Sequence, residues 1–167
     1  MRSRIGRLLA TTMLFTALPL AAQGASDTET LTINAIVAAR ATLTIAPTTI
    51  NFPDADPDAT PSIPANENSV SVQSKVRTSS AGVSTLTCLA NGALQSVSDA
   101  IAISNVTWTA SGAGYVPGTM SDVAAQNVGS WSGSGTRNGN FDFSLANSWD
   151  YNVGSYTQTV LYTLSAP

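Results

Sequence analysis

The sequence contains no histidine and a single cysteine among its 167 residues. Nucleophile systems built on Ser-His-Asp or Cys-His, and zinc sites with histidine ligands, are therefore excluded. Cys88 has no partner for an internal disulfide, so packing must stabilise the fold. In the alternating stretch STLTCLA it shares a parity with Leu86 and Ala90, which predicts a buried, inert thiol. An exposed thiol that forms an intermolecular bridge is the alternative.

Basic residues are also scarce. The chain has seven lysines and arginines against ten aspartates and glutamates, and three of the arginines lie within its first seven residues. Residues 25–167 keep only Arg40, Lys75, Arg77 and Arg137 beside all ten acids, so their net charge is 4 − 10 = −6. Such a surface repels phosphate backbones and the sequence has no basic stripe, so we expect no nucleic-acid partner.

Only one long apolar stretch occurs, and it lies at the N-terminus. Three arginines, an apolar run from Leu8 to Ala22 and then small residues are the pattern of a secretory signal peptide. The run is shorter than the roughly 20 residues that a membrane helix needs. We therefore expect residues 1–24 to be removed and residues 25–167 to form one secreted domain without a transmembrane segment. It would be extracellular or at the cell surface, with passage through the periplasm in a Gram-negative cell.

No long segment shows the 3.6-residue period of a helix. Short alternating segments instead recur between turn signals in a sequence rich in Gly, Ser, Thr, Asn and Val. This pattern predicts an all-β fold, an immunoglobulin-like or pilin-like antiparallel β-sandwich of about 7 to 9 strands. The expected strands are residues 30–46, 48–52, 70–78, 83–90, 100–109, 127–132, 140–146 and 156–165.

Several local patterns refine this prediction. Phe141, Phe143 and Leu145 share a parity that predicts the buried face of their strand. The apolar phase shifts by one between Ile103 and Val106, which predicts a β-bulge. The stretch GSWSGSGTRNGN predicts two strands joined by a hairpin loop.

The C-terminal stretch GSYTQTVLYTLSAP alternates as a strand does. We expect Tyr156 to place its ring in the core and its hydroxyl on a nearby backbone group, as in a tyrosine corner. We also expect this strand to be paired on both sides, because an edge position would leave its hydrogen-bonding groups unpaired.

The N-terminal stretch before Pro47 keeps one parity for fifteen residues, from Leu31 to Ile45. It would extend to roughly 50 Å, whereas a typical strand covers about 17 to 20 Å. Two explanations stay open. One is a first strand that changes sheets at residues 38–41. The other is an extension within residues 25–38, mainly 28–38, that pairs with a neighbouring subunit by strand addition. Four alternate side chains would then fill pockets in that subunit: Leu31, Ile33, Ala35 and Val37.

Two stretches carry a family likeness. LTIAPTTINF, residues 43–52, resembles the opening of secreted pilin-like sandwiches such as the spore coat protein U domain, and also that of the WxL cell-surface domain. The C-terminal stretch is similar to the WxL ending, with Tyr162-Thr163-Leu164 in the place of Trp-x-Leu and Trp108-Thr109-Ala110 in the place of an earlier copy. The resemblance implies a secreted surface module and no catalytic activity.

Candidate chemical sites are few. A carboxylate pair for glycoside hydrolysis would be Asp142 and Asp150, although Asp142 alternates with phenylalanines as a solvent-facing strand residue does. Asp54, Asp56 and Asp58 alternate as in a calcium loop, but Ala59 and Ala65 stand where an EF-hand needs glycine and glutamate, which favours a proline-stiffened loop. We expect no cofactor and no metal.

Three aromatic residues could instead form a sugar-stacking surface: Trp131, Trp149 and Tyr151. Packing in the core or at a corner is the favoured role for each, because large aromatic rings usually stabilise a sandwich. The leading hypothesis is nevertheless a non-enzymatic extracellular structural protein, such as a filament subunit, that self-associates or joins other surface proteins by strand donation. A module that binds cell-wall glycan or another polysaccharide is the alternative.

Overall fold

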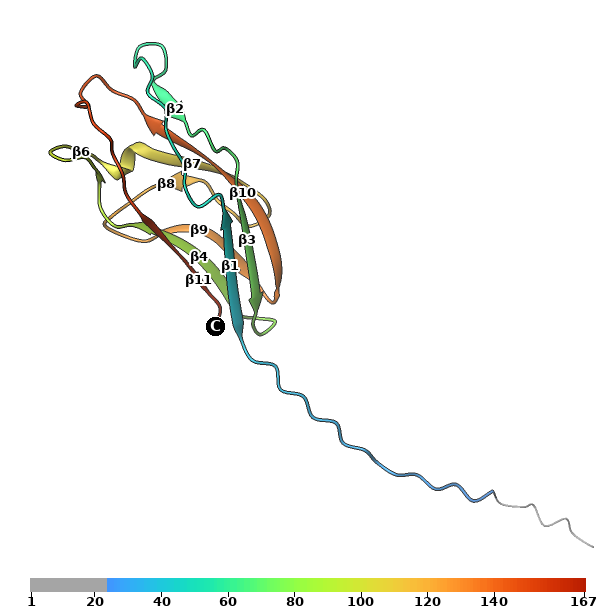
Figure 1. The fold of residues 1–167 in the computed structure, drawn as a ribbon. Coiled ribbons are helices and arrows are strands. Elements are labelled where there is room, and N and C mark those ends of the chain that lie inside the picture. The colour runs from blue at the N-terminus through green and yellow to red at the C-terminus, as the bar shows by residue number, and fades with distance from the viewer. Residues whose placement is uncertain (1–23) are drawn as a thin grey trace, which may run out of the picture. The chain divides into compact units, whose positions relative to one another are not determined.

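The computed structural model describes residues 24–167 (Figure 1). Contacts divide the chain into two units, residues 1–35 and residues 36–167. In the first unit, residues 24–35 form neither helix nor strand, and their side chains are exposed. Residues 1–23, which hold almost all of the predicted signal peptide, lie outside the described residues.

The regular secondary structure of the second unit consists almost entirely of strands. They are β1 (Arg40–Ala46), β2 (Ser62–Pro64), β3 (Val70–Arg77), β4 (Val83–Ala90), β5 (Leu94–Gln95), β6 (Ala100–Ile101), β7 (Val106–Ser111), β8 (Gly118–Thr119), β9 (Gln126–Ser132), β10 (Gly135–Ala146) and β11 (Val160–Ser165). A single turn of 3-10 helix, η1 (Ile103–Asn105), precedes β7. Four of the eleven strands have only two or three residues, and the seven longer ones match the expected number.

The strands form an antiparallel β-sandwich, which confirms the predicted fold class. One sheet has the order β1-β3-β10-β7-β8 with β2 added beside β10, and the other has the order β11-β4-β9. β5 and β6 form a separate two-stranded ribbon. The order β1-β3-β10-β7 matches strands A, B, E and D of an immunoglobulin sandwich, and β4 with β11 matches strands C and F, but β9 beside β4 follows β7 in the chain and has no counterpart in that order. Among residues 24–167, no strand occupies the position of strand G beside β11.

The core lies between the two sheets. It contains the side chains of β10 whose shared parity predicted a buried face. Phe141 is 1% exposed and packs edge-on against Tyr115 and Phe143, with ring centroids 5.7 and 6.2 Å apart. Tyr115 lies under β10 at Gly139, where a Cβ would overlap the tyrosine ring. Its hydroxyl donates a hydrogen bond to the Arg137 carbonyl at 3.0 Å. The absence of a side chain at position 139 therefore lets an aromatic ring contact the strand backbone directly.

Three expected features differ from the structure. β1 begins at Arg40 and stays in one sheet as far as Ala46, so the described residues contain no sheet change at 38–41. Residues 48–52 form no strand. The phase shift before Val106 is accommodated by η1 instead of a β-bulge, since one 3-10 turn also brings Ile103 and Val106 to the same buried side.

Two predictions about strand pairing are wrong. The glycine-rich stretch after Trp131 joins β9 to β10 across the sandwich, because these strands belong to different sheets and form no hairpin. β11 is an edge strand, since within residues 24–167 its one strand partner is β4. The tyrosine corner before β11 is confirmed, because the Tyr156 hydroxyl donates to the Asn152 carbonyl at 2.7 Å while its ring packs against the core.

Candidate functional site

The sandwich has two lateral seams where sheet edges face each other, and only one is bridged. On the side of β7 and β9, the segment 112–121 contacts both sheets. The Val116 amide donates to the Val128 carbonyl in β9, and the Met120 amide donates to the Val106 carbonyl in β7, each at 2.9 Å. On the other side, β1 and β11 lie next to each other (Figure 1), but no backbone hydrogen bond joins them within residues 24–167. The seam between β1 and β11, called the open seam below, is the main candidate site.

Core-facing side chains along the open seam are only partly covered. Val72 and Phe141, on the inner strands β3 and β10, are 2% and 1% exposed. The corresponding side chains of the two edge strands are half-buried: Leu43, Ile45, Val160, Tyr162 and Leu164. Burial raises the pKa of the Tyr162 hydroxyl above its usual range, and the neighbouring Cys88 thiol adds to the effect. The seam therefore presents apolar surface that one more strand would cover.

The outer edge of β11 lacks the features that normally prevent strand pairing. Proteins protect edge strands with charged side chains, prolines or bulges. β11 reads VLYTLS, without a charge, a proline or a glycine, and its pairing with β4 is regular over all six residues. Its outer backbone groups are thus available to a further strand.

The segment before β1 has the complementary character. Leu31 and Ile33 are each 83% exposed and Val37 is 68% exposed, although all three are strongly apolar. Residues 30–39 carry no charge and no proline, so nothing in them opposes a strand conformation. Ala35 completes the alternate set of predicted assembly residues. These residues pair with nothing within the described chain, and their role in assembly stays a prediction.

The three aromatic residues predicted to contact glycan do not form one surface. Trp131 is 7% exposed, with its ring centroid 4.8 Å from that of Tyr115, and its indole N–H donates to the Ala113 carbonyl at 2.7 Å. Its ring is therefore part of the core and offers no face to a sugar. Tyr151 is half-buried, and its hydroxyl donates to the Ala146 carbonyl. Trp149 is 70% exposed, which leaves it as the exposed ring of the three.

The acidic candidates are also separate. Asp142 accepts a hydrogen bond from the Ser69 hydroxyl on the outer face of β10, whereas Asp150 accepts one from Ser148 in the loop that follows. The loop with Asp54, Asp56 and Asp58 is closed by its own backbone hydrogen bonds, and within residues 24–167 no three Asp, Glu or Cys side chains gather as a metal site would require.

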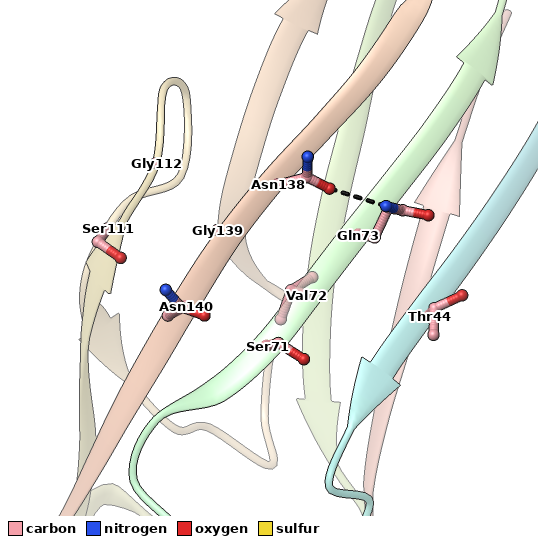
Figure 2. Close-up of a pocket in the computed structure, with 9 residues that line it drawn as sticks. All are labelled: Thr44, Ser71, Val72, Gln73, Ser111, Gly112, Asn138, Gly139 and Asn140. Carbon is pink, nitrogen blue, oxygen red and sulfur yellow. Dashed lines mark hydrogen bonds between the residues drawn. The ribbon is translucent and has the colours of Figure 1, made fainter.

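A shallow groove of about 480 Å³ lies on the outer face of the larger sheet (Figure 2). Its lining residues are Thr44, Ser71, Val72, Gln73, Ser111, Gly112, Asn138, Gly139 and Asn140. The Gln73 amide donates to the Asn138 amide oxygen at 2.9 Å, as Figure 2 shows. None of these side chains ionises, so the groove offers neutral hydrogen-bonding groups and no acid or base for catalysis.

The buried Cys88 thiol gives a direct test of the core. Burial raises its pKa to about 11 from the usual value near 9.0, and the residue is 1% exposed. We expect iodoacetamide at pH 8 to modify Cys88 at least about 100-fold more slowly in the folded protein than in urea, because the reactive thiolate is suppressed and covered. Stability should fall as the pH rises from about 9 to about 11, since only the unfolded thiol ionises readily there. Equal labelling rates in both states, measured by mass spectrometry, would place the thiol at the surface.

Sequence reasoning missed two features of this region. The open edge of β11 was not found, and its outward residues Leu161, Thr163 and Ser165 give only a weak signal, since two of the three are polar. The gathering of all four basic residues of the domain was also missed, since they are far apart in sequence.

No helix within the described residues has the length and apolar character needed to cross a membrane.

Comparison of the chain with known protein families, curated proteins and solved structures gives no match. The geometry of the open seam and of the segment before β1 is therefore the basis for a functional proposal.

Proposed function

We propose that this protein is a non-enzymatic, secreted structural protein of the cell surface whose copies assemble by strand donation into a pilus-like filament. Residues 28–38 of one copy form a strand along β11 of the next copy and cover its open seam. The observation that carries the proposal is the joint presence of an unprotected sheet edge and an unpaired, alternating apolar segment in one chain.

The dimensions of the two parts agree. The seven residues from Leu31 to Val37 extend to about 23 Å, and the six residues of β11 extend to about 20 Å. In a strand over the seam, Leu31, Ile33, Ala35 and Val37 share one face, which would contact the half-buried side chains of β1 and β11. Of the other parity, Thr30, Thr32, Asn34 and Ala38 are polar or small, whereas the apolar Ile36 would also face solvent.

A second copy is a better acceptor than the chain's own seam. To fold back beside β1, the segment would need a tight turn immediately before Arg40. Ala38 and Ala39 occupy that position, whereas such turns require Gly, Asn, Asp or Pro. Donation to another copy needs no turn, and head-to-tail contacts of this kind extend into a fibre because they do not close. The likeness of residues 43–52 and of the C-terminal stretch to secreted surface modules supports the same proposal.

Deleting residues 26–38 tests this function. The mature protein should form species of increasing size as its concentration rises, and the deletion variant should stay monomeric by light scattering because it has lost the donor segment. Circular dichroism of the variant should keep the strand signal of the intact domain. If the shortened and intact mature proteins show the same size distribution, strand donation does not occur.

A further inference from the structure

The four basic residues of the domain lie at one end of the larger sheet, three of them on its outer face. Arg40 and Arg77 are direct cross-strand partners in β1 and β3, and Lys75 is the outward residue next along β3. The fourth, Arg137 in β10, pairs opposite the buried Ser74, so it lies on the core-facing side of the sheet, unlike the other three, and its guanidinium lies beside Gly135. These four residues are called the basic corner below, and three of them line a shallow depression of about 280 Å³.

The basic corner is not neutralised within the domain. The one side-chain hydrogen bond that its members make among the described residues runs from Arg137 to the Thr136 carbonyl, at 3.4 Å. Like charges directly opposite each other on adjacent strands, as Arg40 and Arg77 are, destabilise a sheet. A negatively charged partner from outside the domain would remove that repulsion.

The acids of the domain gather toward the opposite end of the sandwich. Most lie in the loops that follow β1, β5, β8 and β10: Asp54, Asp56, Asp58, Asp99, Asp122 and Asp150. Hydrogen bonds from Ser98 and Asn152 hold the pKa of Asp99 below its usual range, so it stays ionised at neutral pH. Two further acids of the described residues, Asp27 and Glu29, precede the second unit. They lie directly beside the proposed donor strand.

We propose that the basic corner receives Asp27 and Glu29 of a second copy and thereby fixes the direction of strand insertion, antiparallel to β11. This inference rests on the proposed strand donation. β11 ends at the basic corner, because the Pro167 carbonyl accepts a hydrogen bond at 2.7 Å from Thr78, which follows Arg77. β11 begins at the acidic end, where the Asn91 amide donates to the Thr159 carbonyl and the Ala90 amide to that of Ser121, the residue before Asp122.

The two directions of insertion differ in charge. A donor antiparallel to β11 places its early residues at the end of β11, and the four residues from Leu31 back to Asp27 reach about 13 Å further, toward Arg40 and Arg77. A parallel donor would place the same two acids among the acidic loops. Opposite charges across an interface fix register and exclude wrong arrangements, so the antiparallel direction is selected.

Disulfide trapping in the full mature chain tests this direction. Cysteines at Thr28→Cys and Thr78→Cys lie beside the interacting charges without replacing them, and Thr28→Cys with Ser121→Cys reports the parallel direction. The assembled protein is oxidised mildly and its free thiols are alkylated before denaturation. The first pair should then give a ladder of crosslinked chains, and the second pair should give at least about tenfold less crosslinked product. Adding Asp27→Lys and Glu29→Lys to the first pair should reduce its ladder about tenfold at low salt, and adding Arg40→Glu and Arg77→Glu as well should restore it.

Each other outcome has a distinct meaning. A ladder through Ser121→Cys alone would overturn the antiparallel direction but leave strand donation in place. If the amount of the Thr78→Cys ladder is the same with and without the charge reversals, the role of the basic corner is overturned. If neither pair is trapped while the unmodified protein assembles, the inference fails, and binding of dextran sulfate by the corner would assign it to an anionic polymer. A mature protein that stays monomeric removes the proposed function itself.

Discussion

Replacing Leu31 and Ile33 together with aspartate should leave the domain folded and keep the protein monomeric. Covering two such side chains is worth about 1.5–3 kcal/mol each, so their loss weakens association by about 10²- to 10⁴-fold. Aspartate in the seam adds the cost of removing a carboxylate from water. Both side chains are 83% exposed in the single chain, so its stability should change little. Analytical ultracentrifugation over a range of concentrations measures the effect.

Residues of the opposite parity provide the matched control. Thr30→Asp with Thr32→Asp introduces the same charges into the same segment, but on the face that points away from the seam in the donated strand. This variant should assemble within about tenfold of the unmodified protein. Equal loss of assembly in both double variants would show that the segment does not act as a strand with one buried face.

Phe141→Ala should lower the free energy of unfolding by about 3–5 kcal/mol, the largest stability effect that we expect from a single replacement. The ring is 1% exposed and contacts the rings of Tyr115, Phe143 and Tyr162, so its removal leaves a cavity between the sheets. Urea denaturation followed by tryptophan fluorescence measures the change.

Asn140→Ala, one residue earlier on the outer face of β10, is the control for this variant. Its side chain is exposed, and we expect a change within about 0.5 kcal/mol. A cost below about 1 kcal/mol for Phe141→Ala would mean that the contact between the two sheets is looser than the structure indicates.

The sequence predicts the buried faces of the longer strands well, because parity is a local property. The phenylalanines of β10 are buried as expected, and the bounds of β4 agree with the prediction to the residue. Which strands lie side by side is decided by contacts between distant residues. The edge position of β11 therefore could not be read from its alternation alone, which an inner strand would share.

The basic corner could not be predicted from the sequence for the same reason. Arg40, Lys75 and Arg137 are separated by 35 and 62 residues in the sequence, and only the pairing of β1 with β3 and of β3 with β10 brings them together. The burial of Trp131, which was favoured over a sugar-stacking role, is confirmed, but the sequence did not identify the residue against which its ring packs. Its stretch is rich in serine and glycine, but it contributes to the core because Tyr115, from another part of the chain, packs against it.

Hydrogen exchange at β11 tests strand donation most directly, because the donated strand would bond to backbone groups that are free in the single chain. Within Val160–Ser165, the backbone amides that do not bond to β4 are the ones a donated strand would cover. They should exchange at least about 100-fold more slowly in assembled protein than in the monomeric Leu31→Asp, Ile33→Asp variant. Amides of β4, already paired on both sides, should change much less. Equal exchange rates at β11 in the assembled and monomeric proteins would contradict the account.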